Sequence, residues 1–406
     1  MKIAVIGAGI SGLSVAKMLS SRQHDVEIFE AKDAIGGIAK TEQVNGITYH
    51  KTGGHCFNSK YQEVLDFVFS VYPIENWNRI ERIAKIYFRE RFVSYPIEFS
   101  LKEIFEFDQE LVFKIIEDLF TQHDFEPNNL EEWFVHKFGR TLAEEYFIPY
   151  NRKIWGKDLY SMSYEWVHDK LPIPNKREII NSLLRDARDD MPHAFFYYPK
   201  TNDQFDFILA LAEGLKVNLN YKVEKIEYIN DFWVLNGIDK FDTLISTVPM
   251  NLLPKLIENI SEKIIRVAEN LEYNKVTTML WEAESTTNTW TYFPSKDTIF
   301  HRHIHIGNFF KPQKNHIITE AMGEVLEECM IKEGRKFKHL IKPLSYHVSN
   351  HAYVVYDENY TSSKKLILDY LNEINLHTLG RFGEWEYYNM DLCIKSSLEL
   401  VRTKFE

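Results

Sequence analysis

The first thirty residues alternate between apolar runs and a helical pattern. Residues 2–6 form a short apolar run, residues 13–21 repeat apolar positions with a helical period, and residues 26–29 form a second apolar run. Short apolar runs bounded by glycine or charge are typical of buried strands, whereas the longer periodic segment indicates a helix. The pattern therefore predicts a strand, a helix and a second strand, which together begin an α/β unit.

Glycines lie at the connection between the first strand and the helix of this unit, and an acidic residue lies at the end of its second strand. Gly7 permits a tight turn, Gly9 lets a pyrophosphate approach the backbone, and Gly12 lets the helix pack closely on the strand. The N-terminus of the helix offers free N–H groups and a dipole to phosphates. Glu30 ends the second strand, where a carboxylate accepts hydrogen bonds from a ribose hydroxyl. We predict dinucleotide binding; the alternative is a glycine turn in an ordinary α/β unit.

A second pair of glycines bears on which dinucleotide binds. Gly36 and Gly37 follow shortly after Glu30. This segment resembles the FAD-binding half-motif of the glutathione-reductase-like flavoproteins, in which the chain approaches the pyrophosphate again. NAD-dependent dehydrogenases usually lack the pair, so the resemblance favours FAD over NAD.

The pattern changes twice further along the chain. Helical periodicity dominates from about 100 to 190, α/β character returns near 198, and short β-like runs fill 275–350. We predict an α/β fold in which a discontinuous, Rossmann-like FAD-binding domain carries an inserted helical domain and an antiparallel β-sheet domain. The expected bounds are 1–80 plus 195–255 plus 365–406 for the FAD-binding domain, 100–190 for the helical substrate domain, and 81–99 plus 256–364 for the β-sheet domain.

The same pattern of apolar and polar positions predicts the individual helices and strands. Helices are expected at 101–107, 111–122, 130–138 and 142–147, and a last helix begins at about Met390. Strands are expected at 83–88, 91–96, 217–220, 223–226, 233–235 and 241–249.

Charge and composition restrict the partners. The 406 residues include 48 Lys and Arg against 59 Asp and Glu, a formal charge of −11. A net acidic protein is not built for bulk nucleic-acid binding, so an anionic substrate must be met by a few local arginines. No apolar run approaches the ~20 residues that a membrane span needs. The chain begins directly with a predicted strand, so we expect no signal peptide.

The three cysteines, Cys56, Cys329 and Cys393, are widely spaced and form no C-x-x-C pair, which favours a reducing compartment. We therefore expect a cytoplasmic enzyme, with a homodimer as one possible assembly. His301, His303 and His305 alternate along a predicted strand, and alternation puts them on one side of it. No acidic or cysteine partner lies nearby in the sequence, so we expect no metal site.

Four further segments resemble the UDP-galactopyranose mutase family. They contain Gly53-Gly54-His55, the run from Tyr146 to Gly156, Phe300-His301-Arg302, and the run from Gly380 to Asp391. Their order and approximate spacing match the family, so the resemblance spans nearly the whole chain. The second and fourth segments are fairly specific, whereas other FAD amine-oxidase-like proteins share the first and parts of the last.

The resemblance implies a flavin-dependent mutase that interconverts the pyranose and furanose forms of a nucleotide-diphosphate sugar, UDP-galactose or a related sugar. In this family reduced FAD attacks the anomeric carbon through N5 and forms a flavin–sugar adduct, without net redox change. NAD(P)H or another reductant must supply the reduced flavin. The resemblance further implies a role in surface polysaccharide biosynthesis.

The resemblance also assigns roles to residues. Arg302 matches the family arginine beside the diphosphate, Trp155 forms a wall near the sugar, and His55 faces the flavin. A second family arginine has no clean match; Lys170 is the best candidate and Arg177 the alternative. The remaining substrate-binding candidates are Tyr146, Phe147, Tyr150, Tyr353, Tyr387 and Asn389, and the cofactor-binding candidates are Gly7, Gly9, Gly12, Glu30, Gly36, Gly37, His55, Val223, Arg381, Asn389 and Met390.

Simpler interpretations remain for single residues. Arg302 also fits a solvated sheet face, Tyr353 also fits plain packing, and Asn389 also fits a helix cap. Departures from the family, such as Pro149-Tyr150-Asn151, leave the sugar open and leave UDP, dTDP or GDP as the nucleotide. The rival function is an FAD-dependent oxidoreductase of the amine-oxidase or protoporphyrinogen-oxidase type, which the glycine motifs fit equally well.

Overall fold

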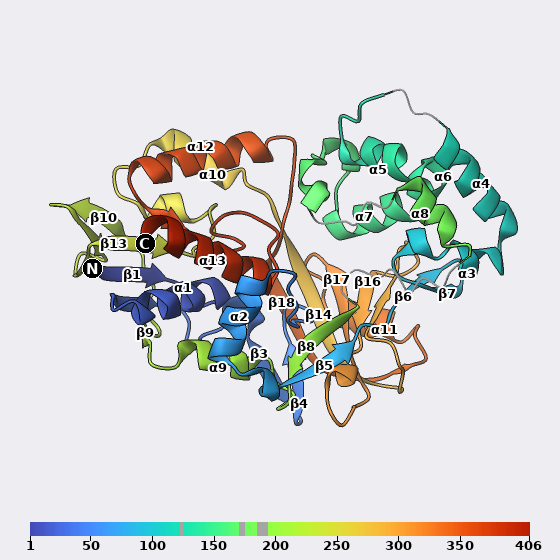
Figure 1. Cartoon of the computed structure of the whole chain (residues 1–406), viewed down its shortest axis with the longest axis horizontal. Coiled ribbons are helices and arrows are strands. Elements are labelled where there is room, and N and C mark those ends of the chain that lie inside the picture. The colour runs from blue at the N-terminus through green and yellow to red at the C-terminus, as the bar shows by residue number, and fades with distance from the viewer. Residues whose placement is uncertain (122–124, 170–174, 185–193) are drawn as a thin grey trace.

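A computed structural model describes residues 1–121, 125–169, 175–184 and 194–406. Figure 1 shows an elongated molecule with both termini in one lobe and a group of short helices at the far end of the other. Two sheets form the frame: a parallel sheet beside the termini and a large, mostly antiparallel sheet in the other lobe. The predicted α/β fold with a Rossmann-like domain is confirmed.

The parallel sheet contains the predicted N-terminal unit. Its five strands lie in the order β19-β13-β1-β2-β9 and all pairs are parallel. The bounds are Lys2–Ile6 for β1, Asp25–Phe29 for β2, Lys216–Asn218 for β9, Thr243–Ser246 for β13 and His377–Thr378 for β19. Strand β1 is buried in the centre, because its residues Ile3 to Ile6 are apolar on both faces.

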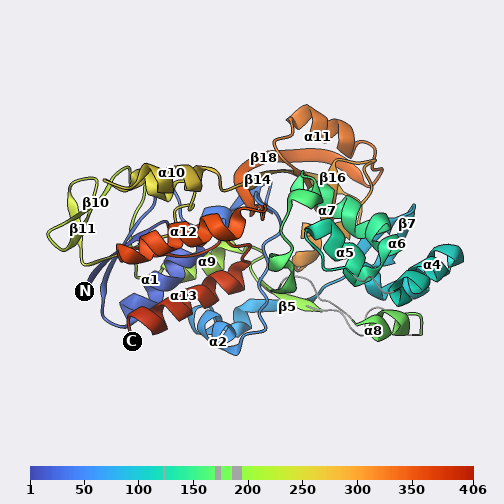
Figure 2. The ribbon, with the colours of Figure 1, turned by 90° about the horizontal axis from the view of Figure 1, so that it is seen from above.

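Helices cover this sheet. Helix α1 (Ile10–Ser21) packs against α13 (Met390–Lys404) and α9 (Phe205–Ala212), and α2 (Gln62–Val71) packs against α13. Figure 2 shows α10 (Glu262–Glu269) and α12 (Tyr360–Glu373) beside this group. A three-stranded meander extends near the N-terminus and comprises β10 (Ile226–Ile229), β11 (Phe232–Leu235) and β12 (Asp239–Phe241).

The larger sheet has seven strands in the order β18-β14-β17-β16-β15-β6-β7. Every neighbouring pair is antiparallel except β15 and β6, which run parallel. The bounds are Ala84–Phe88 for β6, Arg91–Ser94 for β7, Tyr273–Ala283 for β14, Trp290–Tyr292 for β15, Phe300–Ile304 for β16, His316–Met322 for β17 and Leu340–Val354 for β18. Helix α11 (Glu327–Gly334) packs on this sheet, where Gly334 lies against the indole of Trp281.

Two further strand pairs complete the structure: β3 (Thr41–Val44) with β4 (Ile47–His50), and β5 (Trp77–Glu81) with β8 (Phe195–Pro199). The helical segment contains α3 (Leu101–Phe105), α4 (Gln109–Phe120), α5 (Leu130–Phe138), α6 (Arg140–Leu142), α7 (Ile148–Trp155) and α8 (Lys176–Asn181). A π-helical turn, Ala143–Phe147, joins α6 to α7.

Some element boundaries differ from those expected, for local reasons. Helix α4 starts at Gln109 because the Asp108 side chain accepts a hydrogen bond from the Leu111 N–H and caps the helix. The strand expected at 223–226 begins only at Ile226. The Asn236 side chain instead binds the backbone N–H groups of Glu224 and Lys225, which removes them from a sheet ladder.

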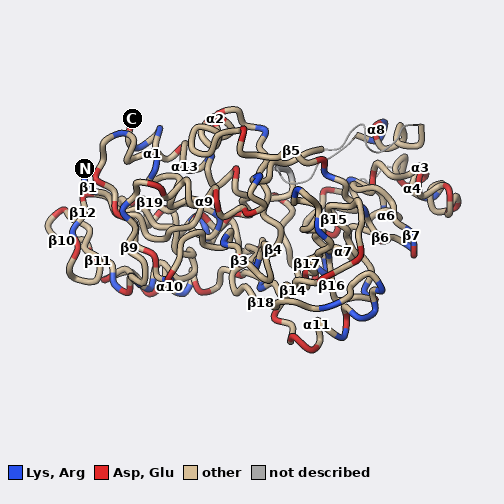
Figure 3. The backbone as a smooth tube through the Cα atoms, turned by 90° about the horizontal axis from the view of Figure 1, so that it is seen from below, with Lys and Arg blue, Asp and Glu red and all other residues tan. Residues whose placement is uncertain are grey.

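Charge is distributed along the whole chain. Figure 3 shows lysine and arginine interspersed with aspartate and glutamate in both lobes. Within the described residues, no helix combines the length and the apolar character needed to cross a bilayer.

Crowding at the glycine turn gives a stability prediction. A Cβ on Gly12 would lie 2.0 Å from the Gly7 carbonyl oxygen, whereas a Cβ on Gly9 would meet only the Gly37 Cα at 3.8 Å. Because overpacking displaces backbone here, we expect Gly12→Ala to lower the free energy of unfolding by about 1–3 kcal/mol. Gly9→Ala serves as the matched control. In urea unfolding of flavin-free protein, where a bound cofactor cannot contribute, it should change the free energy of unfolding by less than about 1 kcal/mol. Equal losses in both variants would contradict the packing argument.

Candidate active site

One large cavity lies where the two sheets and the helical segment meet. Its volume is about 1800 Å³, which exceeds the ~1000 Å³ of the larger ordinary ligand pockets and leaves room for two ligands. Nearly all predicted site residues line it. They are Gly7, Gly9, Glu30, Gly36, Gly37, His55, Tyr146, Phe147, Tyr150, Trp155, Val223, Arg302, Tyr353, Arg381, Tyr387, Asn389 and Met390.

The glycine turn forms one end of the cavity. Gly7 adopts a positive φ of 101° and donates its N–H to the Phe29 carbonyl at 2.8 Å, so the turn requires glycine. Gly9 is the N-cap of α1 and no side chain caps the helix, which leaves its first N–H groups for a ligand. A Cβ on Gly37 would stand 3.1 Å from the Gly9 Cα. Gly12 does not line the cavity but packs beneath it, as its predicted packing role requires.

The Glu30 carboxylate is held in position beside this turn. It accepts hydrogen bonds from the Ala8 N–H at 2.8 Å and from the Lys32 N–H at 2.9 Å. Two bonds occupy only part of the capacity of a carboxylate, and the residue also faces the cavity. The glycine cradle, the uncapped helix and this acid together fit the adenosine diphosphate half of FAD.

His55 lies further along the cavity. Its backbone N–H donates to His50 Nδ1 at 3.2 Å, and His50 Nε2 is 2.7 Å from the Tyr198 hydroxyl. The ring Nε2 of His55 is buried and has no hydrogen-bond partner among the described residues. Burial, with the nearby Arg381 charge, lowers the pKa of His55 to about 4. The ring is therefore neutral near pH 7 and offers an unused nitrogen to a bound group.

Arg381 is held by aromatic rings rather than by a carboxylate. Its guanidinium carbon lies 4.3 Å from the centre of the Tyr387 ring and 5.1 Å from that of Tyr353. These two rings stack on each other at 5.3 Å. It also lies 5.8 Å from the centre of the Phe382 ring and donates to the carbonyls of Ala352 and Tyr388. Among the described residues Arg381 has no carboxylate partner, so an anion at the cavity wall would stabilise its charge.

Arg302 forms an ion pair with the fully buried Glu320. It also donates from Nη2 to the Tyr353 hydroxyl at 3.1 Å. Burial alone would raise the pKa of Glu320, but the Arg302 guanidinium and the His301 ring lower it to about 2. The carboxylate therefore holds one edge of Arg302, while the rest of the guanidinium faces the cavity.

A β-bulge explains why two adjacent residues reach the same carboxylate. The register between β16 and β17 shifts between Phe300 and Arg302, and His301 Nε2 lies 3.3 Å from Glu320 Oε2. His303 instead packs among aromatic rings, and His305 contacts the Thr291 hydroxyl at 2.9 Å. The expected placement of all three histidines on one side of a regular strand is wrong because of this bulge. Within the described residues, no group of three potential metal ligands occurs.

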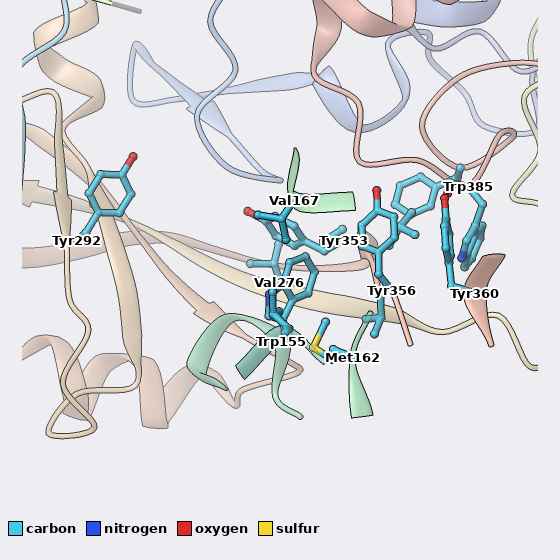
Figure 4. Close-up of a cluster of buried hydrophobic side chains, with 14 of the residues drawn as sticks. Trp155, Met162, Val167, Val276, Tyr292, Tyr353, Tyr356, Tyr360 and Trp385 are labelled. Atoms are coloured by element: carbon cyan, nitrogen blue, oxygen red, sulfur yellow. The ribbon is translucent and has the colours of Figure 1, made fainter. Parts of the chain in front are cut away.

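Aromatic side chains line the end of the cavity farthest from the glycine turn. Tyr146 stacks on Tyr150 at 5.5 Å, and Tyr150 contacts Tyr292 edge to face. Phe147 stacks on Phe138 at 4.0 Å, within the core of the helical segment. Trp155, Tyr292, Tyr353 and Tyr356 belong to one buried hydrophobic cluster, and Figure 4 shows Tyr292 apart from the other three in this view.

Trp155 is fixed within this cluster by its own helix. Its indole N–H donates to the Asn151 side chain at 3.2 Å, and its ring contacts Trp166 edge to face at 5.2 Å. The side chain is buried and lines the cavity. A rigid apolar wall of this kind excludes water from one side of a bound ligand.

Sequence reasoning missed Arg82. Its Nη2 donates to the Tyr292 hydroxyl at 3.0 Å, and its guanidinium lies over the rings of Trp290 at 5.0 Å and Tyr95 at 5.5 Å. It lines the cavity and makes no ion pair within the described part of the chain. Arg82 belongs to no motif; the only signal was its position directly before the strand predicted at 83–88.

Only one of the two candidates for the second family arginine lies among the described residues. Arg177 is exposed on α8 and does not line the cavity. Lys170 lies outside the described residues. Arg82 and Arg302 both line the cavity near Tyr292. Arg82 donates a hydrogen bond to the Tyr292 hydroxyl, and Arg302 is the cross-strand partner of Tyr292.

Comparison with known proteins agrees with this geometry. Residues 5–70 match the family model for an NAD(P)-binding Rossmann-like domain. The UDP-galactopyranose mutase of Mycoplasma genitalium is 22% identical over 98% of this chain and 93% of its own length. The predicted resemblance to the UDP-galactopyranose mutases is confirmed. A dTDP-fucopyranose mutase of Escherichia coli is 26% identical over 39% of this chain and 42% of its own length.

Solved structures show the same fold. A crystal structure of reduced UDP-galactopyranose mutase matches with a TM-score of 0.86 at 23% identity, covering 98% of this chain and 94% of that one. A putative protoporphyrinogen oxidase from Exiguobacterium matches with a TM-score of 0.76 at 15% identity, covering 99% and 98%. The chain therefore shares the fold of a UDP-galactopyranose mutase, and the relatives named as mutases support the prediction of an enzyme of the isomerase class. Its relatives imply a flavin cofactor.

The buried ion pair gives a prediction for the pH dependence of stability. Because the pKa of Glu320 in the folded chain is about 2, below its ordinary value of 4.5, ionised Glu320 stabilises the fold above pH 4.5. That stability is lost as the pH falls toward 2. We expect wild type to lose ~2 kcal/mol more than Glu320→Gln between pH 5 and pH 3. Urea unfolding at both pH values measures this, and parallel losses would contradict the assignment.

Proposed function

We propose that the protein is an FAD-dependent mutase that interconverts the pyranose and furanose forms of a nucleotide-diphosphate sugar. One observation carries the proposal: a single cavity joins a dinucleotide-binding turn to two guanidinium groups, Arg302 and Arg82, with aromatic rings beyond them. Diphosphates are bound by guanidinium groups, and nucleobases stack on aromatic rings. UDP-galactose or a related sugar is the proposed substrate, since relatives are named for UDP-galactopyranose and dTDP-fucopyranose.

The cavity supports an order for the two ligands. FAD would lie along Gly7, Gly9, Glu30 and Gly37, with its reactive ring toward His55 and Arg381. The remaining candidate cofactor contacts, Gly36, Val223, Asn389 and Met390, line the same region. Reduced FAD, when bound, supplies through N5 the nucleophile that displaces the diphosphate from the anomeric carbon.

The residues of the chain provide the electrostatic part of the reaction. Arg302 and Arg82 bind the diphosphate and stabilise the charge that it gains when it leaves the sugar. The hydroxyls of Tyr353 and Tyr387 donate to phosphate oxygens. Arg381 favours an anionic reduced cofactor, because its charge has no carboxylate partner in the described structure.

Two other groups position the reacting sugar. Neutral His55 can donate or accept a hydrogen bond near the reactive ring without carrying a charge. Trp155 shields one side of the sugar from water, and Tyr146, Phe147 and Tyr150 form the aromatic end that receives the base. NAD(P)H or another reductant, a homodimer, a cytoplasmic location and a role in surface polysaccharide synthesis remain predictions of the sequence.

An anaerobic assay tests the reaction class. We expect protein reduced with dithionite to convert UDP-galactofuranose to UDP-galactopyranose, or to isomerise another sugar in a panel of nucleotide sugars, as followed by liquid chromatography. The oxidised protein should be inactive, because the nucleophile requires reduced flavin. Oxygen consumption by the oxidised protein with an amine or a porphyrinogen, without any sugar isomerisation, would instead identify an oxidase.

Substitutions of the two arginines test the diphosphate site. Arg302→Lys retains a positive partner for Glu320 but loses bidentate geometry, and Arg82→Ala removes the second guanidinium. We expect each to reduce kcat/KM by about 10²–10³-fold, because the lost donors stabilise the transition state, while the bound flavin absorbance stays unchanged. Arg177→Ala is the matched control and should retain activity. If Arg177→Ala loses activity while Arg82→Ala keeps it, the second diphosphate-binding cation is Arg177 on α8 and not Arg82.

Gly9→Ala tests the cofactor site separately. Its fold should survive, as argued above, but a methyl group would stand where the pyrophosphate approaches the backbone. We expect purified Gly9→Ala to contain less than about a tenth of the wild-type flavin per protein, measured by absorbance after denaturation. Full flavin content in Gly9→Ala would place the cofactor elsewhere.

A further inference from the structure

A buried acid stands at the aromatic end of the cavity. Glu98 lies in the short 3₁₀ helix Ile97–Phe99, directly after β7, and is 3% exposed. It lines the cavity together with Tyr95 and Tyr146. An acid with no ion-pair partner among the described residues is costly to bury unless it remains neutral or meets a ligand.

The surroundings of Glu98 contain no neutralising cation among the described residues. Glu98 interacts electrostatically with Tyr95 and Tyr146, and the Arg82 guanidinium lies 5.5 Å from the centre of the Tyr95 ring. Burial raises the pKa of Glu98 to about 7. The elements packed on its helix carry further charges. Arg91 on β7 and Lys102 on α3 are exposed, as are Lys176, Arg177 and Glu178 on α8. Glu103 on α3 pairs with Lys85 and accepts a hydrogen bond from the Ser94 N–H.

The position of Glu98 relative to the arginines follows from ring contacts. Tyr292 accepts a hydrogen bond from Arg82 and pairs across the strands with Arg302. Tyr95 contacts Tyr292 at 5.0 Å, and Glu98 lies in the next turn of chain after Tyr95. Glu98 therefore lines the same cavity as the two arginines and is linked to them through the rings of Tyr95 and Tyr292.

We infer that Glu98 selects the base of the nucleotide sugar by pairing its carboxyl group with the N3–H and O4 edge of uracil or thymine. The inference rests on the proposed function, because it requires the diphosphate to lie at Arg302 and Arg82. It names the substrate class more closely: a sugar carried by UDP or dTDP rather than by GDP.

The hydrogen-bonding groups of a neutral carboxylic acid complement uracil and thymine better than guanine. A neutral carboxylic acid has one acceptor and one donor side by side, so its carbonyl accepts N3–H and its hydroxyl donates to O4. Guanine presents two adjacent donors, N1–H and N2–H, which suit an ionised carboxylate instead. The burial and the missing cation favour the neutral acid. An ionised Glu98 would repel O4, so the affinity for uracil should fall as the acid loses its proton.

Binding of matched nucleotide sugars to the oxidised flavoprotein tests the inference. UDP-glucose, dTDP-glucose and GDP-glucose share one sugar and keep a constant diphosphate charge between pH 6 and 8.5. We expect wild type to bind UDP-glucose and dTDP-glucose more tightly than GDP-glucose at pH 6, and to lose about 30-fold in affinity for UDP-glucose by pH 8.5, as follows from a pKa near 7. Isothermal titration calorimetry gives the dissociation constants.

Two variants isolate the carboxyl group. The amide of Glu98→Gln mimics the neutral acid, so this variant should bind UDP-glucose at every pH as wild type does at pH 6. Glu98→Ala should bind it about 10- to 100-fold more weakly, because two hydrogen bonds are lost. The control Glu106→Gln alters an exposed acid that does not line the cavity and should match wild type, including its pH dependence.

Each contrary outcome has a distinct meaning. Tighter binding of GDP-glucose with affinity that rises with pH would overturn the inference in favour of guanine. A UDP-glucose affinity that is independent of pH in wild type and unchanged in Glu98→Ala would show that Glu98 does not touch the base. Binding of no nucleotide sugar and no inorganic pyrophosphate by wild type or any variant would instead count against the proposed function itself.

Discussion

The ion pair between Arg302 and the buried Glu320 organises the cavity. A carboxylate without water needs a partner at close range, and Arg302 provides it across two strands. The same guanidinium binds the Tyr353 hydroxyl, Tyr353 stacks on Tyr387, and Arg381 lies against both rings. One buried charge thus fixes a row of side chains that spans the cavity from the sheet to the cofactor side.

This arrangement places positive charge at the cavity of a protein whose net charge is negative. A chain with a formal charge of −11 repels anions at long range. The cavity offsets this repulsion with guanidinium groups held mainly by aromatic rings and carbonyls. Arg82 and Arg381 have no carboxylate partner in the described structure, so their charges remain available to an anionic ligand. Aromatic rings hold a cation in place without cancelling its field at the ligand.

Sequence reasoning succeeded where function depends on local backbone geometry. Gly7, Gly9 and Glu30 sit in a continuous stretch whose conformation follows from residue type, so the turn and its neighbouring strands were predictable. Sequence reasoning failed where the position of a side chain depends on pairing between strands that lie far apart in the sequence. Arg82 reaches the cavity because Ile83 pairs with Thr289, 206 residues further along the chain, and no local pattern encodes that contact. The β-bulge before Arg302 likewise depends on the neighbouring strand, so simple alternation misplaced His301.

The fold leaves the choice between mutase and oxidase open, because a protoporphyrinogen oxidase structure shares it over nearly the whole chain. The chemistry of the cavity wall makes the distinction. An apolar or porphyrin-like substrate would leave Arg82 and Arg302 facing an apolar surface, with their desolvation uncompensated. A diphosphate removes that cost, because its oxygens take up the N–H donors that tyrosine and glutamate leave unused. Arg302 already has Glu320 as an anionic partner, so Arg82, which has no carboxylate partner in the described structure, is the stronger argument for an anionic ligand, and the aromatic rings nearby favour one attached to a base.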